Sequence, residues 1–312
     1  MNTVSYGNGV SNMNDKIIIT GLGKSYWNKR ALNNVDLVIE QGMFGLLGRN
    51  GAGKTTLMKI LATLLQKGEG KINVCGIPIE NTKEIRKITG YLPQDFSMYP
   101  SMRIEEAMDY LGILSGIETK ERHVRIDRLL RKVNLQDHRK DKVKTLSGGM
   151  KRRLGIAQAL LNDPKVLIVD EPTAGLDPEE RIRFRNLLCE VAEERIVILS
   201  THIVGDIEAT CEKIAILNEG QLLYNGTVDA LLEEARGKVY TKEADKRELP
   251  KLKKEFRITS MHTQGTRVYV RFLSEMPVND AQICEPNIED AYMLHLYRNG
   301  VQNLDDAAGG EG

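Results

Sequence analysis

The sequence predicts an α/β protein built on a mostly parallel sheet with helices on both sides. Two observations carry this prediction. An early strand at 43–48 leads through a glycine-rich turn into residues 53–65, whose apolar spacing is helical. Further strand-like runs, apolar on both faces and separated by helical segments, lie at 89–93, 165–170, 196–200 and 213–218. Such runs are typical of parallel strands that helices cover on both faces.

The two ends of the chain are predicted to be disordered. Residues 1–15 are polar and rich in Asn, Gly and Ser, and residues 303–312 are rich in Gly and acidic side chains. Segments of this composition bury too little apolar surface to offset the entropy lost on ordering. The folded part therefore begins with a strand that we predict at 16–20.

Residues 101–146 interrupt the alternation of strands and helices, because they carry helical patterns only. Their apolar side chains recur at i, i+3, i+4 and i+7 on one helix face, at Ile126, Leu129, Leu130 and Val133. The segment is predicted to be a helical insertion in the main domain.

The composition changes again after about residue 237, which predicts a small α+β accessory domain over 238–300. A hairpin is expected over 258–272 with its turn at Gly265, followed by a short helix over 288–297. From the sequence, this domain could serve regulation, dimerisation or packing alone.

Composition excludes several classes of protein. The 312 residues hold 44 Lys and Arg against 43 Asp and Glu, so no overall field favours nucleic acid as a partner. The four cysteines lack C-x-x-C spacing, which argues against disulfides and a zinc site. No apolar run approaches the roughly 18 residues of a membrane-spanning helix, and the first residues lack a signal-peptide pattern. The sequence therefore predicts a soluble, cytosolic protein.

The stretch GRNGAGKT at 48–55 matches the pattern of a phosphate-binding loop between a strand and a helix. Gly51 and Gly53 let the backbone bend around a phosphate, and the helix start directs N–H groups at it. Lys54 would reach the β and γ oxygens, and Thr55 would offer its hydroxyl to Mg²⁺. The candidate nucleotide-binding residues here are Asn50, Gly51, Ala52, Gly53, Lys54, Thr55 and Thr56.

Two adjacent carboxylates follow the apolar run VLIV, at Asp170 and Glu171. They emerge at the carboxyl end of a predicted core strand, where open α/β sheets bind ligands. We expect Asp170 to hold the Mg²⁺ shell and Glu171 to orient or deprotonate the attacking water. Together with the phosphate loop, they predict an ATP hydrolase.

A second anion-binding helix start is predicted in TLSGGMKRRL, at 145–154. Ser147 can cap the helix, Gly148 and Gly149 leave N–H groups uncovered, and basic residues follow. A phosphate loop holds a triphosphate from one side only, so donors from an opposing helix end would complete the enclosure. We therefore expect Ser147, Gly148 and Gly149 to bind nucleotide as well.

Six motifs in the order GRNGAGKTT, LPQ, LSGGM, VLIVDE, GLDP and STH resemble the ATP-binding cassette of ABC transporters, over residues 16–236. The resemblance implies a P-loop NTPase fold with an N-terminal antiparallel β part and a helical subdomain at about 101–146. It also implies that two cassettes pair head to tail, as a homodimer or a heterodimer. The LSGG of each would then close over the γ-phosphate held by the other.

Further residues are assigned by this resemblance. Gln94 is similar to the glutamine that touches Mg²⁺ or water, and His202 to the histidine that contacts the γ-phosphate. Asp177 resembles an aspartate at the dimer interface. Tyr26 resembles the aromatic residue that stacks on adenine, although Trp27 could take that place.

The same resemblance suggests the kind of transporter. LSGGMKRRL and, near the C-terminus, NIEDAYMLHL resemble ATPases of ABC-2 type exporters for drugs and bacteriocins. An importer ATPase or a non-transport ABC ATPase remains the alternative. A separate membrane permease is the expected partner, with the protein peripheral on the cytoplasmic face of the membrane and nucleic acid excluded. The basic stretch 119–144 could face anionic lipid or simply solvent.

Overall fold

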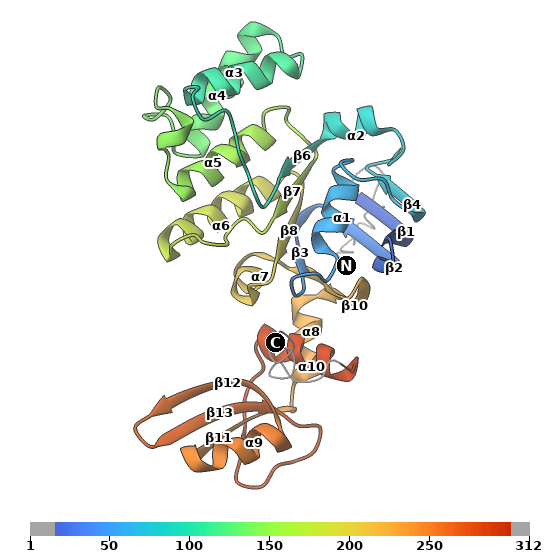
Figure 1. Ribbon diagram of the computed structural model, residues 1–312, viewed down its shortest axis with the longest axis vertical. Helices are drawn as coiled ribbons and strands as arrows, with labels where there is room; N and C mark the ends of the chain where they lie inside the picture. The colour runs from blue at the N-terminus through green and yellow to red at the C-terminus, as the bar shows by residue number, and fades with distance from the viewer. Residues whose placement is uncertain (1–15, 301–312) are drawn as a thin grey trace, which may run out of the picture.

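The computed structural model describes residues 16–300 and shows three sheets with helices packed around them (Figure 1). The disorder predicted for residues 1–15 and 303–312 concerns segments outside the described part. A six-stranded sheet forms the centre, and all its neighbouring strands are parallel except the first pair. Its order is β10 (Gln221–Thr227), β9 (Lys213–Asn218), β3 (Gly42–Leu47), β8 (Ile196–Thr201), β7 (Val166–Asp170) and β6 (Thr89–Leu92). The predicted α/β class and mostly parallel sheet are confirmed.

The central strands fold as strands because their side chains are apolar on both faces and both faces are covered. Every residue of β7 and β8 is buried. On one side lies a helical layer, α5 (Gly148–Ala159) and α6 (Pro178–Ala192), and on the other lies α1 (Lys54–Leu61) (Figure 1). The carboxyl ends of β3, β7 and β8 consequently meet at one edge of the sheet.

A second, antiparallel sheet covers α1. Its strands are β2 (Lys29–Glu40), β1 (Lys16–Tyr26), β4 (Glu69–Val74) and β5 (Ile77–Pro78), in that spatial order. Leu57 and Met58 of α1 share one buried cluster with Ile17 of β1 and Phe44 of β3. The predicted strand at 16–20 is the start of β1, which extends six residues further to Tyr26 and pairs with β2. A short helix, α2 (Thr82–Ile88), connects this sheet to β6.

Helix α1 is shorter than the predicted helix over 53–65, because it ends at Leu61. Thr63 takes a left-handed φ of 58°, which no helix continues. The N–H groups of Leu64 and Leu65 turn back to the carbonyl oxygen of Lys59 at 2.8 and 3.1 Å. The apolar spacing of the sequence continues past this turn. The helix end predicted at residue 65 was therefore wrong by four residues.

The insertion at about 101–146 is helical, as the apolar spacing indicates. It contains α3 (Ile104–Leu114), α4 (Thr119–Lys132) and a 3-10 turn at Val143–Thr145. The four residues that mark the apolar face are all buried, namely Ile126, Leu129, Leu130 and Val133. Helices α3 and α4 of this insertion lie at the upper left of Figure 1, beyond α5.

The C-terminal region forms a third sheet with strands β12 (Arg257–Gln264), β13 (Arg267–Leu273), β11 (Val239–Asp245) and β14 (Gln282–Ile283). The predicted hairpin is confirmed as β12 and β13, and Gly265 at its turn has a φ of 61° that favours glycine. Helix α9 (Leu249–Glu255), which follows a 3-10 turn at Lys246–Glu248, packs with this sheet around Phe272.

The last helix, α10 (Ile288–Arg298), confirms the predicted helix at 288–297 but returns to the main body of the protein (Figure 1). Its Ile288, Ala291 and Leu294 belong to the same buried cluster as Leu231 of α8 (Val228–Ala235). The same cluster includes Ile207 of α7 (Val204–Thr210). The region after residue 238 thus has a small core of its own and also contributes one helix to the main core. The division into domains at 236–238 stays a prediction.

Candidate functional site

A polar cavity of about 480 Å³ lies where the central strands end. The loop after β3 contributes its floor, Glu171 comes from the end of β7, and Gln94 follows β6. Tyr26 approaches from the antiparallel sheet. The lining residues are Tyr26, Lys29, Ala31, Arg49, Asn50, Gly51, Gly53, Lys54, Thr55, Thr56, Gln94 and Glu171.

The turn between β3 and α1 depends on its glycines. Gly51 and Gly53 have φ angles of 80° and 108°, a region that side chains rarely adopt. A Cβ on Gly53 would also meet the carbonyl oxygen of Ala31 at 2.5 Å. Helix α1 begins directly after Gly53, so its unpaired N–H groups point into the cavity, where they favour an anion.

Lys54 supplies a buried positive charge to this cavity. Its Nζ donates to the carbonyl oxygens of Gly48 and Arg49 at 2.6 and 3.1 Å, and only 4% of the residue is exposed. The same Nζ lies 3.1 Å from Oε1 of Glu171. The loop carbonyls and the carboxylate hold the ammonium in place, since a buried charge is costly without such partners.

Glu171 joins that ammonium to an imidazole. Its Oε2 lies 3.0 Å from Nδ1 of His202, which follows β8 and remains partly exposed. Glu171 adopts a left-handed φ of 45°, and its N–H donates to the carbonyl oxygen and to Oγ of Ser200 at 3.1 and 3.2 Å. An unusual backbone conformation held by hydrogen bonds is a feature of functional sites. The two predicted catalytic residues Glu171 and His202 are therefore in contact.

Asp170 is the last residue of β7, does not line the cavity and is completely buried. Its Oδ1 accepts a 2.5 Å hydrogen bond from Oγ of Ser200, whereas its Oδ2 has no hydrogen-bond partner within residues 16–300. Burial and the nearby charge of Asp170 raise the pKa of Tyr91 to about 12. An unsatisfied carboxylate oxygen at the end of β7, on a sheet edge whose cavity Thr55 and Gln94 line, suits a hydrated Mg²⁺, which binds through one or two carboxylates plus phosphate oxygens. The residues present therefore fit the predicted metal.

Five other predicted residues do not line this cavity, and one of them, Ala52, is buried within the phosphate loop. The Oγ of Ser147 accepts from the N–H of Met150 at 3.2 Å, so the predicted helix cap is confirmed. Asp177 caps α6 in the same way, by accepting from the N–H of Glu180 at 2.9 Å. Gly148 is exposed and open, and Gly149 is buried against Glu180. The second helix start is thus formed, but it does not face the phosphate loop of its own chain.

Two of the basic residues after that helix start, Arg152 and Arg153, serve the fold of their own chain. Arg152 donates to the carbonyl oxygen of Pro93 at 3.1 Å, and Arg153 to those of Val133 and Asn134 at 2.8 and 3.0 Å. Burial lowers the pKa of Arg152. These contacts join α5 to the segment just before Gln94 and to the end of α4.

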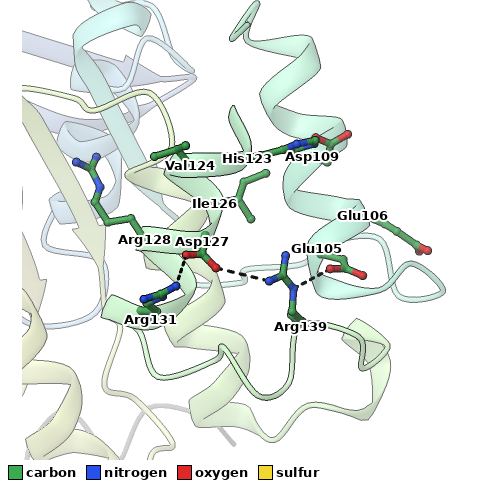
Figure 2. Close-up of a pocket in the computed structure, with 10 residues that line it drawn as sticks. All are labelled: Glu105, Glu106, Asp109, His123, Val124, Ile126, Asp127, Arg128, Arg131 and Arg139. Atoms are coloured by element: carbon green, nitrogen blue, oxygen red, sulfur yellow. Dashed lines mark hydrogen bonds and ion pairs between the residues drawn. The ribbon is translucent and has the colours of Figure 1, made fainter. Parts of the chain in front are cut away.

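A larger cavity, of about 880 Å³, lies between α3 and α4 in the helical insertion (Figure 2). Several of its charged side chains are paired with one another: Arg139 lies 2.8 Å from Glu105, and Asp127 lies 2.7 Å from Arg131. None of the residues predicted to act in catalysis lines it. The larger volume therefore does not make this cavity a catalytic site. The smaller cavity at the sheet edge is the candidate site.

Comparison with known proteins agrees with this geometry. The family model described as ABC transporter matches residues 32–174. The ABC transporter ATP-binding protein YxlF of Bacillus subtilis (strain 168) is 37% identical over 224 residues, 72% of this chain and 75% of that protein. The chain belongs to the ABC transporter ATP-binding proteins. The Nod factor export ATP-binding protein I of Burkholderia lata is 35% identical over 217 residues, 69% of this chain and 71% of that protein.

Solved structures of ATP-binding cassettes share the fold. A dimeric cassette in a post-hydrolysis state with ADP and Pi superposes with a TM-score of 0.62 at 25% identity, over 68% of this chain and 98% of that one. The predicted P-loop NTPase cassette fold is confirmed. The protein is an ABC-type ATPase subunit that binds and hydrolyses ATP. Within residues 16–300, no helix is both long and apolar enough to cross a bilayer.

The cassette places Tyr26, and not Trp27, at the cavity. Tyr26 lines it with Lys24 5.6 Å from the ring centre, whereas Trp27 stands fully exposed in a turn with a φ of 48°. Sequence reasoning missed Lys29 and Ala31, because both lie on β2, a strand that it did not predict. Arg49 is not among the predicted residues either, although it lines the cavity and stands inside the phosphate-loop motif, where it could have been found.

Proposed function

We propose that this subunit pairs with a second cassette around two ATP and two Mg²⁺ and so drives a separate membrane permease that exports its substrate. One observation carries the proposal. The phosphate loop, Glu171 and His202 meet at one sheet edge, while the capped helix start at Ser147 is formed outside that cavity. Each chain thus carries two parts of an ATP site that do not face each other, and a head-to-tail pair would join them.

In each composite site, the loop of residues 48–55 holds the phosphates, and Lys54 stabilises the β and γ oxygens. Glu171 accepts the proton of the attacking water or orients it, since its carboxylate already contacts His202. His202 and Gln94 contact the γ-phosphate and the water. Tyr26 stacks on adenine, and the N–H groups at Gly148 and Gly149 of the second cassette close over the γ-phosphate.

When bound, Mg²⁺ supplies positive charge that stabilises the transferring phosphate. Thr55 and Gln94, which line the cavity, and Asp170, whose Oδ2 has no hydrogen-bond partner within residues 16–300, would hold the ion. Asp177 would stand at the contact between the two cassettes. Loss of the γ-phosphate on hydrolysis would remove the bridge between them and let the pair open.

Export is favoured over import by two observations. The motif LSGGMKRRL resembles that of ABC-2 type exporters, and a relative that matches 69% of the chain is named for Nod factor export. The subunit would bind its permease at the cytoplasmic face of the membrane. Purification of the intact complex from membranes identifies the permease, and a substrate-binding protein in that complex would favour an importer.

Mixed variants test the composite site. Lys54→Ala disables the phosphate loop, and Ser147→Asp keeps a good helix cap but sets a negative charge against the γ-phosphate. A heterodimer of the two holds one doubly disabled and one intact site. An equimolar mixture should therefore recover about a quarter of the wild-type sites, although each variant alone is inactive.

Ser147→Asn is the matched control, because it caps the helix without adding charge and should keep more activity than Ser147→Asp. ATPase activity of the mixture, measured over a range of protein concentrations, is the readout. A mixture as inactive as its components, together with a wild-type rate per subunit that does not depend on concentration, would contradict the composite site.

A further inference from the structure

The loops after β7 and β8 are joined by a buried hydrogen bond that has no part in the ATP hydrolysis mechanism proposed for this site. Thr173 lies two residues after Glu171, and Asp206 lies four residues after His202. The Thr173 hydroxyl donates to Oδ2 of Asp206, and the two residues are 1% and 0% exposed. The bond therefore ties the segment that carries the proposed base to the segment that carries the imidazole.

A second tie lies on the strand side of the same contact. Ser200 precedes His202 by two residues and binds both Asp170, through Oδ1, and Glu171, through its N–H. Hydrogen bonds thus flank the 3.0 Å contact of Glu171 with His202 on both sides. The bonds of Ser200 lie before His202 in the chain, and the bond of Thr173 to Asp206 lies after it. Only the bond of Thr173 to Asp206 depends on residues outside the predicted motifs.

Packing alone does not explain the burial of Asp206, because burying its carboxylate costs folding stability. It is completely buried, its Oδ1 has no hydrogen-bond partner within residues 16–300, and the nearest cation is Nη1 of Arg185 at 3.7 Å. The guanidinium of Arg185 instead donates to the carbonyl oxygen of Gly205 at 3.2 Å. Burying a carboxylate with so few partners costs stability, so a neutral residue would serve the core better.

The position of Asp206 suggests what it does. It lies in the first turn of α7, a helix of seven residues whose start at Ile203 has no side-chain cap. His202 immediately precedes this start. A contact that holds the first turn of α7 in place therefore also holds the position of the His202 imidazole. Thr173 is the side chain that holds Asp206 from the opposite loop.

We propose that Thr173 and Asp206 are a pair of positioning residues that sets the distance between Glu171 and His202 during ATP hydrolysis. This inference rests on the catalytic roles proposed above. Neither residue touches the nucleotide in this account. Catalysis gains because the two reacting side chains are held in one geometry before ATP arrives.

The first test is Thr173→Val, which removes the hydroxyl and keeps the shape. We expect kcat to fall about tenfold, the effect of one hydrogen bond to a charged group, with nucleotide affinity within about twofold. Thr173→Ser should restore kcat. Thr210→Val is the matched control, because that hydroxyl also bonds Asp206, at its main-chain oxygen, but does not reach the Glu171 loop. Unchanged kcat in Thr173→Val would overturn the proposal.

A double-mutant cycle separates positioning from general destabilisation. In a His202→Ala background, Thr173→Val should lower the single-turnover rate by less than about twofold, because the side chain that it positions is gone. A full tenfold loss in both backgrounds would overturn the proposal. Thermal unfolding of each variant accompanies these rates.

Asp206→Asn gives an independent readout if the valine variant fails to fold. The amide keeps an acceptor for Thr173, so kcat should stay within about threefold of wild type, and a larger loss would overturn the hydrogen bond as the cause. Glu171→Gln distinguishes failure of the proposed catalytic role of Glu171 from failure of the proposed positioning role of Thr173. If it is fully active, the proposed catalytic role fails and this inference with it; if it is inactive while Thr173→Val is fully active, only the positioning pair fails.

Discussion

The Nζ atom of Lys54 lies 3.1 Å from Oε1 of Glu171, and their side chains are only 4% and 7% exposed. The residue that would hold the γ-phosphate is thus paired with the residue that would activate water. A phosphate entering the cavity competes with the carboxylate for the same ammonium and is repelled by the carboxylate itself. Substitutions at either residue should therefore change the energetics of the other.

Glu171→Gln should lower turnover by roughly 10² to 10⁴, because the general base is lost. It should bind ATP at least as tightly as wild type, because the amide neither repels the γ-phosphate nor retains Lys54. ATP should then accumulate in a trapped dimer. Rapid-quench hydrolysis, nucleotide titration and light scattering measure these quantities, and a monomer at saturating ATP would contradict the expectation.

Lys54→Ala should abolish measurable nucleotide binding, because it removes the phosphate ligand and leaves the buried Glu171 carboxylate without the ammonium that pairs with it. The double variant Lys54→Ala, Glu171→Gln should bind ATP more tightly than Lys54→Ala alone, since that anion is gone. Titration with a fluorescent ATP analogue checks both. Undiminished affinity in the single variant, or equal affinity in both variants, would show that the pair has no part in binding.

His295 on α10 should make the fold sensitive to acid. Burial lowers its pKa from the ordinary 6.5, although Glu234, with its Oε2 3.1 Å from Nε2, opposes this shift. The unfolded chain therefore binds the proton more readily than the native one. Stability from the neutral imidazole is present above pH 6.5 and is lost as pH falls towards the lower native pKa. Urea unfolding of His295→Gln should show a smaller loss of free energy between pH 7 and 5 than wild type, and equal losses would refute the prediction.

Leu294→Ala should destabilise the whole protein and not only its C-terminal region. Leu294 is 1% exposed and packs in the main core with α8, so its truncation should cost about 2–5 kcal/mol of unfolding free energy. Met261→Ala, at a half-exposed position on β12, should cost within about 0.5 kcal/mol. Chemical denaturation measures both. Deletion from residue 238 onward is a less specific test, because it would also remove α10 from the core.

Local chemistry accounts for what could be predicted. The phosphate loop, the cap at Ser147 and the turn at Gly265 each depend on residues within a few positions of one another. Asp170 and Glu171 were located because a fully buried strand ends where ligands bind in such sheets. The early end of α1 was missed because a single left-handed residue, Thr63, overrides apolar spacing.

The sequence by itself determined the family, five of the six central strands and the residues able to bind a triphosphate, because periodicity, caps and glycine turns are short-range properties of the chain. Only the tertiary structure decided that Lys54 contacts Glu171, that Thr173 holds Asp206 and that α10 enters the main core. These contacts join residues brought together when strands distant along the chain become neighbours. Their partners follow from sheet order and packing, which no local pattern encodes.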